Sequence, residues 1–461
     1  MKPQRFILHL GLGAFHRAHQ AAYLQRLHDL GDREWQIVSG NIRSTTPDPA
    51  RQLQTQDYAY TLETISPAGE RAYQLIKATA RAVPYEPRLA EIIERGADAA
   101  TGIISFTVTE AGYFLDADDR LDLASADLCA DIAAARQGLP GTTIYGALSA
   151  ILRQRSKIGA GPVTLLCCDN LRHNGSRFRQ GLMQFMELTG DLALLDWVRA
   201  HTTSPCTMVD RITPRTPPEL AARVLRATGR HDAAPVMSES FMQWVLEDDF
   251  CNGRPDWVRA GAQLVASVAP YEEAKIRILN ATHSCIAWAG ALAGHRYIHE
   301  CMRDRRIHAM AHAYVTEAVF DCLRPSPVDL ERYRDQVFQR FASDAIEDTT
   351  ERVLADGFAK LPGFVLPTLA ERLSRGLDVA SVALLPALFL QFLRRWYNGD
   401  LKLVYSDQAM DSRTVADICR ASDPVAAFCS QRALWDDLAD SPRILAAMRL
   451  ASVRVHEFER A

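Results

Sequence analysis

The sequence predicts an α/β protein, with an N-terminal Rossmann-type domain containing a parallel sheet, followed by a mainly α-helical C-terminal domain. Three observations predict this fold class. Short strand-like runs alternate with helical patterns over the first two-thirds of the chain, a glycine loop follows the first run, and strand patterns fade after about residue 270. At 461 residues the chain is also too long for one ordinary hydrophobic core, so two domains are expected.

The strands of the first domain are expected at residues 5–10, 35–40, 102–109 and 162–168. Each run is short, apolar or β-branched, and ends in polar residues or glycine. Helical patterns lie between the runs, for example at residues 18–30 and 147–155. Strands that alternate with helices imply a parallel sheet covered on both faces.

The C-terminal helices are expected at residues 273–293, 309–323, 330–341, 378–397 and 441–453. Asp378 and Ser441 are residue types that cap helices, and Pro442 would then take the favoured first helical position. Pro270 interrupts the chain just before the first of these helices. We therefore expect a Rossmann-type domain over residues 1–268 and a helical domain over residues 269–461.

Composition excludes several classes of function. A net charge of -4 and a pI near 6.4 give no electrostatic case for binding nucleic acid or an anionic membrane. The longest apolar run, residues 379–393, contains Pro386 and is too short to span a bilayer. The ten cysteines show neither a disulfide framework nor zinc-type spacing, so we expect reduced thiols and no metal site. No signal-peptide pattern opens the chain, so a cytoplasmic location is expected.

The glycine loop directly follows the first strand and opens a helix. Gly11 permits a tight turn, Gly13 lets the backbone approach a pyrophosphate, and Ala14 and Phe15 begin the helix whose N–H groups face that ligand. His16 stands where a third glycine is usual, so the motif is incomplete. Dinucleotide binding is the favoured interpretation, and a plain tight turn is the alternative.

The end of the second strand leaves the choice of cofactor open. A carboxylate there would bind the ribose of NAD, whereas an arginine could accept the 2′-phosphate of NADP. Asn41 and Arg43 occupy this region, and Asp48 is the available acidic candidate. His16 and His19 could ligate a metal, but no third ligand is evident, so packing or a phosphate contact is favoured.

A candidate catalytic group lies on the helix expected at residues 273–293. At about 100° per residue, His283 falls about 80° from Lys275, and Asn280 about 140° from it. Alcohol oxidation needs a base for the hydroxyl proton and donors for the developing alkoxide, and these residue types supply both. The alternative is that Lys275 is solvated and His283 is a hydrogen-bonded core residue.

A second polar cluster, Asp169-Asn170-x-x-x-Asn174-Gly175, follows the strand expected at residues 162–168. Ligands of open α/β sheets bind beyond the carboxyl ends of the strands, which suits Asn170. Asp and Asn also favour turns, so ordinary turn chemistry is the alternative.

Three motifs together resemble the polyol-specific long-chain dehydrogenases, the mannitol dehydrogenase family. They are Gly11-x-Gly13-x-Phe15-His16-Arg17-Ala18-His19, the Asp169-Asn170 cluster, and Lys275-x4-Asn280-x2-His283. The resemblance extends from residue 6 to at least residue 365. It implies a metal-independent, mainly NAD-dependent and often monomeric enzyme that interconverts a small polyol and its ketose.

The same resemblance implies roles for individual residues. Lys275 is implied as the general base, Asn170 and Asn280 as the pair that holds the alkoxide oxygen, and His283 as a group that orients the substrate. Further substrate contacts are implied at Val209, Asp210, Arg352 and Lys360.

Within the family, the segments at residues 40–43 and 61–64 are more similar to the arabinitol-oxidising members than to the mannitol-oxidising members. This favours oxidation of D-arabinitol to D-xylulose, with mannitol to fructose, or reduction of a hexuronate, as alternatives. A non-catalytic dinucleotide-binding regulator would have no need for Lys275, Asn170 and Asn280 together, and a zinc alcohol dehydrogenase would need a ligand set that the sequence lacks.

Overall fold

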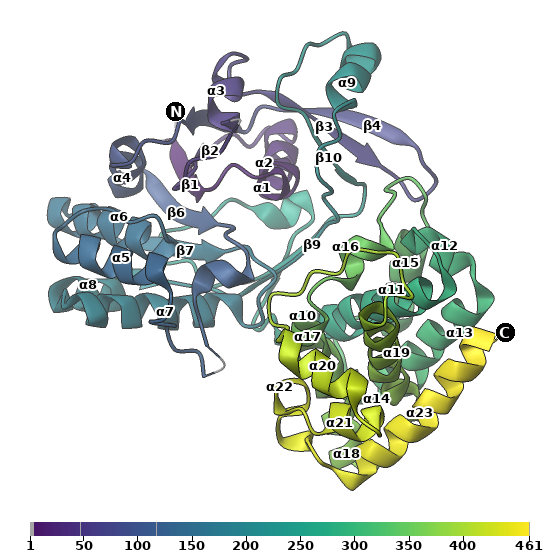
Figure 1. The fold of residues 1–461 in the computed structure, drawn as a ribbon. Helices are drawn as coiled ribbons and strands as arrows, with labels where there is room; N and C mark the ends of the chain where they lie inside the picture. Colours follow the sequence, from purple (N-terminus) through teal and green to yellow (C-terminus); the bar gives the residue numbers. More distant parts are fainter. Residues whose placement is uncertain (1–3, 47, 117, 461) are drawn as a thin grey trace. The chain divides into compact units, whose positions relative to one another are not determined.

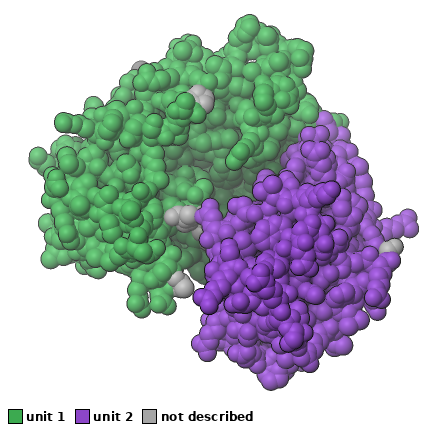
Figure 2. Space-filling view, in the orientation of Figure 1, with its two compact units in different colours: residues 1–66, 70–269 green, residues 67–69, 270–461 purple. Residues whose placement is uncertain are grey.

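The structure, a computed structural model, describes residues 4–46, 48–116 and 118–460 (Figure 1). The chain divides into two compact units. Unit 1 contains residues 1–66 and 70–269, and unit 2 contains residues 67–69 and 270–461 (Figure 2).

A six-stranded parallel sheet forms the centre of unit 1. Its strands are β1 (Arg5–Leu10), β2 (Trp35–Gly40), β5 (Thr79–Val83), β6 (Thr101–Phe106), β7 (Val163–Cys167) and β8 (Thr202–Thr203). Their spatial order is β5-β2-β1-β6-β7-β8, with every neighbouring pair parallel. This is the Rossmann order 3-2-1-4-5-6, so the predicted fold class of this part is confirmed.

Alternate residues of β1, β2, β5, β6 and β7 belong to two separate hydrophobic cores, one on each side of the sheet. In β1, Ile7 belongs to one core and Leu8 to the other; in β6, Ile103 and Ile104 divide in the same way. One core includes residues of α4 (Ala90–Ala97), α5 (Ala126–Arg136), α6 (Ile144–Ile158), α7 (Asn174–Thr189) and α8 (Leu192–His201). The opposite core includes residues of α1 (Ala14–Ala18), α2 (Gln20–Asp29) and α3 (Pro49–Gln54).

Two three-stranded sheets complete unit 1. One has the order β10 (Val236–Glu239), β3 (Tyr60–Ile65), β4 (Arg71–Ile76), and the other β12 (Gln263–Val265), β11 (Gln243–Glu247), β9 (Thr207–Asp210). The short elements of this unit are α9 (Leu220–Thr228), η1 (Glu110–Tyr113) and η2 (Trp257–Ala260). The sequence analysis does not predict these sheets. In β3, Glu63 is fully buried and ion-paired to Arg71 and Arg223, which interrupts the apolar pattern of a buried strand.

Unit 2 is built from helices, as predicted. They are α10 (Ala269–Ala274), η3 (Lys275–Asn280), α11 (Ala281–Ala293), α12 (Ile298–Arg303), α13 (Arg305–Ala313), η4 (Tyr314–Val319), α14 (Phe320–Leu323), α15 (Leu330–Phe341), α16 (Thr350–Leu354), α17 (Gly357–Lys360), η5 (Leu361–Val365), α18 (Leu366–Ser374), α19 (Ala380–Tyr397), α20 (Ser412–Arg420), α21 (Pro424–Cys429), α22 (Arg432–Trp435), η6 (Asp436–Leu438) and α23 (Pro442–Arg460). α11 and α19 are apolar and buried, and α23 packs along α19.

The expected helix boundaries need two corrections. Asp378 is not the N-cap residue of α19, because the helix begins at Ala380 and Val379 is the N-cap residue. Asp378 lies one position before Val379, and its carboxylate accepts the Ala380 amide at 3.2 Å. The long helices expected at residues 273–293 and 309–323 are not α-helical throughout, because η3 and η4 are π-helical, as is η5. Pro442 does begin α23. Within the described ranges, no helix is long and apolar enough to cross a membrane.

Candidate functional site

The glycine loop connects β1 to α1. Gly11 has a φ of 125°, a conformation that side-chain-bearing residues rarely adopt, and its amide donates to the Gly40 carbonyl at 2.8 Å. Gly13 precedes α1, and a Cβ built there meets no atom within 4 Å. Ala14 and Phe15 form the first turn of α1. The loop therefore leaves open space beside the backbone at Gly13, as close approach of a pyrophosphate requires.

The histidines of the loop motif are packing residues. His16 stacks on His9 with ring centroids 3.5 Å apart, and its Nε2 lies 3.3 Å from Ser39 Oγ. Burial lowers the pKa of His9 to about 3 and that of His16 well below its usual value, so both rings are neutral. His19 Nε2 lies 3.0 Å from the Gln243 carbonyl oxygen. No cluster of three or more potential metal ligands occurs in residues 4–46, 48–116 and 118–460.

The residues after β2 each make local contacts. Asp48 caps α3, since its carboxylate accepts the Ala50 amide at 3.0 Å. Arg43 donates to the Thr142 carbonyl at 2.8 Å and pairs with Asp127 at 3.3 Å. This capping role accounts for an aspartate at position 48 without any ligand. The predicted contact of Asp48 with a cofactor ribose stays a prediction.

In the polar cluster after β7, Asp169 and Asn174 are buried and Asn170 is exposed. Asp169 accepts the Val108 and Thr109 amides at 2.8 and 3.0 Å. Asn174 donates to the Thr207 carbonyl at 2.9 Å and accepts the Thr207 amide at 2.9 Å, which joins the start of α7 to β9. Both residues therefore serve the local structure. Asn170, by contrast, is exposed at the carboxyl end of the strand, where ligands of such sheets bind.

Val209 and Asp210 end β9 and are both buried. They pair with Trp244 and Gln243 on the antiparallel strand β11. Their backbone positions are thus fixed by a sheet, which suits a contact that must hold one substrate geometry.

Lys275 and Asn280 are the first and last residues of the π-helical segment η3, and His283 lies in the first turn of α11. A π-helix has i→i+5 hydrogen bonds and turns about 80° per residue. Asn280 therefore falls about 40° from Lys275, and His283 about 20° from it on the other side. The separation of about 140° applies to an α-helix, which this segment is not. The angles of a regular π-helix would bring all three residues to one face.

Asp348, a residue that the sequence analysis missed, lies beside His283. The Asp348 carboxylate lies 3.4 Å from His283 Nε2 and accepts Arg352 Nε at 2.5 Å. Phe341 stacks on the imidazole with centroids 4.4 Å apart. Burial lowers the His283 pKa and outweighs the opposing effect of Asp348, so the ring is neutral. Burial would raise the pKa of Asp348, but His283 and Arg352 outweigh it and lower that pKa. The sequence signal that could have identified Asp348 is its position as an acidic residue four residues before Arg352.

Lys360 ends α17 and lies in the same part of unit 2. Its Nζ donates to the Val353 carbonyl at 2.8 Å. Burial, and to a smaller extent the charge of Arg352, lowers its pKa to about 8 despite the opposing Asp356. Unit 2 thus brings His283 and Arg352 together at Asp348, and Lys360 bonds to the residue that follows Arg352.

Both units match families of known proteins. Residues 5–259 match the mannitol dehydrogenase Rossmann domain, and residues 267–455 match the mannitol dehydrogenase C-terminal domain. D-arabinitol 4-dehydrogenase of Ralstonia nicotianae is 54% identical over 99% of this chain and 97% of its own length. D-arabinitol 4-dehydrogenase of Klebsiella pneumoniae is 49% identical over 96% of both chains.

A solved structure is also similar over the whole chain. The ternary complex of Pseudomonas fluorescens mannitol 2-dehydrogenase with NAD and D-mannitol is 31% identical. It superposes with a TM-score of 0.86 and covers 99% of this chain and 94% of that one.

Proposed function

Because this chain belongs to the mannitol dehydrogenase family, we propose that it oxidises D-arabinitol to D-xylulose with NAD. The observation that carries the choice of polyol is the high identity to two D-arabinitol 4-dehydrogenases along nearly the entire chain. The mannitol enzyme of known structure is considerably more distant. Mannitol oxidation is therefore the less favoured alternative.

The residues of the glycine loop fit a dinucleotide. Gly11 makes the turn, Gly13 leaves space beside its backbone, and Ala14 and Phe15 would lie next to the bound phosphates. When bound, the oxidised nicotinamide accepts the hydride that leaves the carbinol carbon. The choice of NAD over NADP is supported by the similar mannitol 2-dehydrogenase, whose solved complex contains NAD. A ribose contact by Asp48 is part of the same proposal.

The chain's own residues would manage the proton. Lys275 takes the proton of the reacting hydroxyl while the carbon–hydrogen bond breaks, and the side-chain amides of Asn170 and Asn280 donate to the developing alkoxide oxygen. Lys275 is only 6% exposed, so a substrate hydroxyl bound beside it would compete with little bulk water.

The remaining groups would bind the other hydroxyls of the polyol. Neutral His283 can donate or accept a hydrogen bond, whereas Arg352 and Lys360 donate and Asp210 accepts. Val209 would supply an apolar contact beside Asp210. A linear polyol presents several hydroxyls in a fixed stereochemical order, so this mixture of donors and acceptors can select among isomers.

A substrate panel tests the proposal. Reduction of NAD and of NADP is followed with D-arabinitol, D-mannitol, D-sorbitol and xylitol in turn, and oxidation of NADH with a hexuronate. We expect the highest kcat/KM for D-arabinitol with NAD, and D-xylulose as the product identified by chromatography. A higher kcat/KM for mannitol, or activity confined to the uronate, would refute the assignment. The mass of the protein in solution tests the expected monomer.

A further inference from the structure

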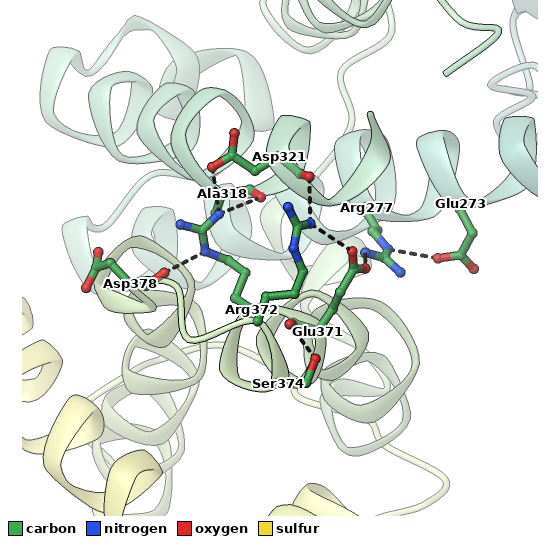
Figure 3. A network of polar contacts seen from close by, with 9 residues as sticks. Glu273, Arg277, Ala318, Asp321, Glu371, Arg372, Ser374 and Asp378 are labelled. Carbon is green, nitrogen blue, oxygen red and sulfur yellow. Dashed lines mark hydrogen bonds and ion pairs between the residues drawn. The ribbon is translucent and has the colours of Figure 1, made fainter. Parts of the chain in front are cut away.

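The face of η3 opposite Lys275 carries a buried cation. Arg277 follows Lys275 by two residues, which places it about 160° away on a π-helix. Its side chain is 11% exposed. Nε donates to Glu273 at 2.8 Å and Nη1 donates to Glu371 at 2.7 Å (Figure 3). Two carboxylates thus compensate the cost of burying this charge.

Glu371 connects η3 to α18 and, through it, to the neighbouring helices. The carboxylate of Glu371 also accepts Arg375 at 3.3 Å, and Arg375 donates to the Asp321 carbonyl at 2.8 Å. The next residue, Arg372, donates to Asp321 at 3.2 Å and to the Ala318 carbonyl at 3.1 Å (Figure 3).

The network therefore joins the π-helical segments η3 and η4 and includes α18, which follows the third, η5. Arg277 belongs to η3, Ala318 to η4, and Glu371 to α18, which continues directly from η5. A π-helix is rarer than an α-helix and is found mainly at functional sites, which indicates that it needs external support. In η3 that support comes from the side of the helix that Lys275 does not face.

We infer that Arg277 and Glu371 are positioning residues that hold η3 in π-helical form and so keep Lys275 and Asn280 on one face. Without this ion pair, relaxation of η3 to an α-helix would increase the angle between Lys275 and Asn280 from about 40° to about 140°. The base and the alkoxide donor could then no longer reach the same oxygen atom. The inference rests on the proposed roles of Lys275 and Asn280.

The test uses Glu371→Gln, Arg277→Met and Arg277→Lys in the full-length protein. We expect kcat with D-arabinitol to fall by about tenfold to a hundredfold in the first two variants, since a misplacement of about 1 Å has this effect. The pH profile of kcat/KM should shift as well, because the surroundings of the base change, whereas the dissociation constant for NADH should stay within about twofold. Arg277→Lys keeps the charge and should recover part of kcat. The double variant should lose less than the two single losses multiplied together, since both substitutions break the same Arg277–Glu371 ion pair.

A matched control is Arg395→Gln, which breaks a partly buried ion pair with Glu459 between α19 and α23 of the same unit, at 3.1 Å. It should lower thermal stability but leave kcat per folded molecule and the pH profile unchanged. If Glu371→Gln and Arg277→Met behave like this control, the network is only structural and the inference is wrong. The proposed function fails separately, if Lys275→Ala retains turnover.

Discussion

The Asp348 carboxylate lies 3.4 Å from Nε2 of His283 and at the same time pairs with the guanidinium of Arg352. One carboxylate thus sets the position of two groups proposed to bind the polyol. Neutral His283 and cationic Arg352 would present different hydrogen-bonding character to neighbouring hydroxyls, and Asp348 fixes the distance between them.

Replacing Asp348 with Asn should weaken substrate binding more than catalysis. The amide keeps the size of the side chain but loses the charge that holds Arg352, so we expect KM for D-arabinitol to rise about tenfold, with a smaller change in kcat. Steady-state kinetics at saturating NAD measures this. Asp344→Asn, which removes an exposed ion pair with Arg303, is the control and should change neither constant. An unchanged KM in Asp348→Asn would show that the carboxylate does not position the substrate contacts.

Lys275→Ala should abolish turnover while the cofactor still binds. General bases contribute about a hundredfold to ten-thousandfold, so kcat should fall within or beyond that range. NADH binding, followed by fluorescence titration, should be within about threefold of the unsubstituted protein. Lys402→Ala, at an exposed lysine of the same unit, is the control. Residual activity above one-tenth of normal would contradict the assignment of the base.

Gly13→Ala should separate cofactor binding from stability. A Cβ at Gly13 meets no protein atom within 4 Å, so the melting temperature should change by no more than about 2 °C. The same methyl group would lie where a pyrophosphate must approach, so the dissociation constant for NADH should rise at least tenfold. Gly363→Ala, at another position with open space, should alter neither quantity strongly. Normal NADH affinity in Gly13→Ala would place the dinucleotide elsewhere.

The stacked pair His9 and His16 should make the protein sensitive to acid. The usual pKa of histidine is 6.5, whereas that of His9 is about 3 in the folded protein and that of His16 is also lowered. The unfolded chain therefore binds more protons below pH 6.5, so the stability present above this pH is lost as pH falls. His9 should reduce the free energy of unfolding by about 1.4 kcal/mol between about pH 7.5 and pH 5.5, and His16 should act in the same direction.

Urea unfolding at the two pH values measures this loss. His9→Asn should be less stable at neutral pH, because the ring stack is lost, but should show a smaller dependence on pH. His456→Asn, at an exposed residue of α23, is the control and should keep the full dependence. An equal pH dependence in His9→Asn and in the unsubstituted protein would show that the buried ring does not carry the effect.

Regular hydrophobic patterns predicted the framework of the fold. β1, β2 and α15 have the bounds expected from the sequence, because the two strands are short, almost continuously buried runs and the burial of α15 recurs at helical spacing. The sheet containing β3 escaped prediction because Glu63 is buried by ion pairs with Arg71 and Arg223, which are 8 and 160 residues away in the chain. Local patterns carry no signal of such a distant partner.

The motifs predict roles for Lys275, Asn280 and His283, and these roles stay predictions. The local geometry was not predictable, because the segment from Lys275 to Asn280 is π-helical rather than α-helical. The π-helical form depends on hydrogen-bond register and on contacts with α18, neither of which changes the order of apolar and polar residues. Asp348 was missed for a similar reason, since its significance lies in two contacts made after folding.

The wide turn of η3 accommodates a residue that a regular helix would not. The number of residues from Lys275 to Asn280 therefore matters together with the helix type, because five π-helical residues turn about as far as four α-helical ones. In a homologue, a one-residue gap between the lysine and the asparagine would accordingly mark a segment in which an ordinary α-helix keeps the two side chains on one face without the bulge.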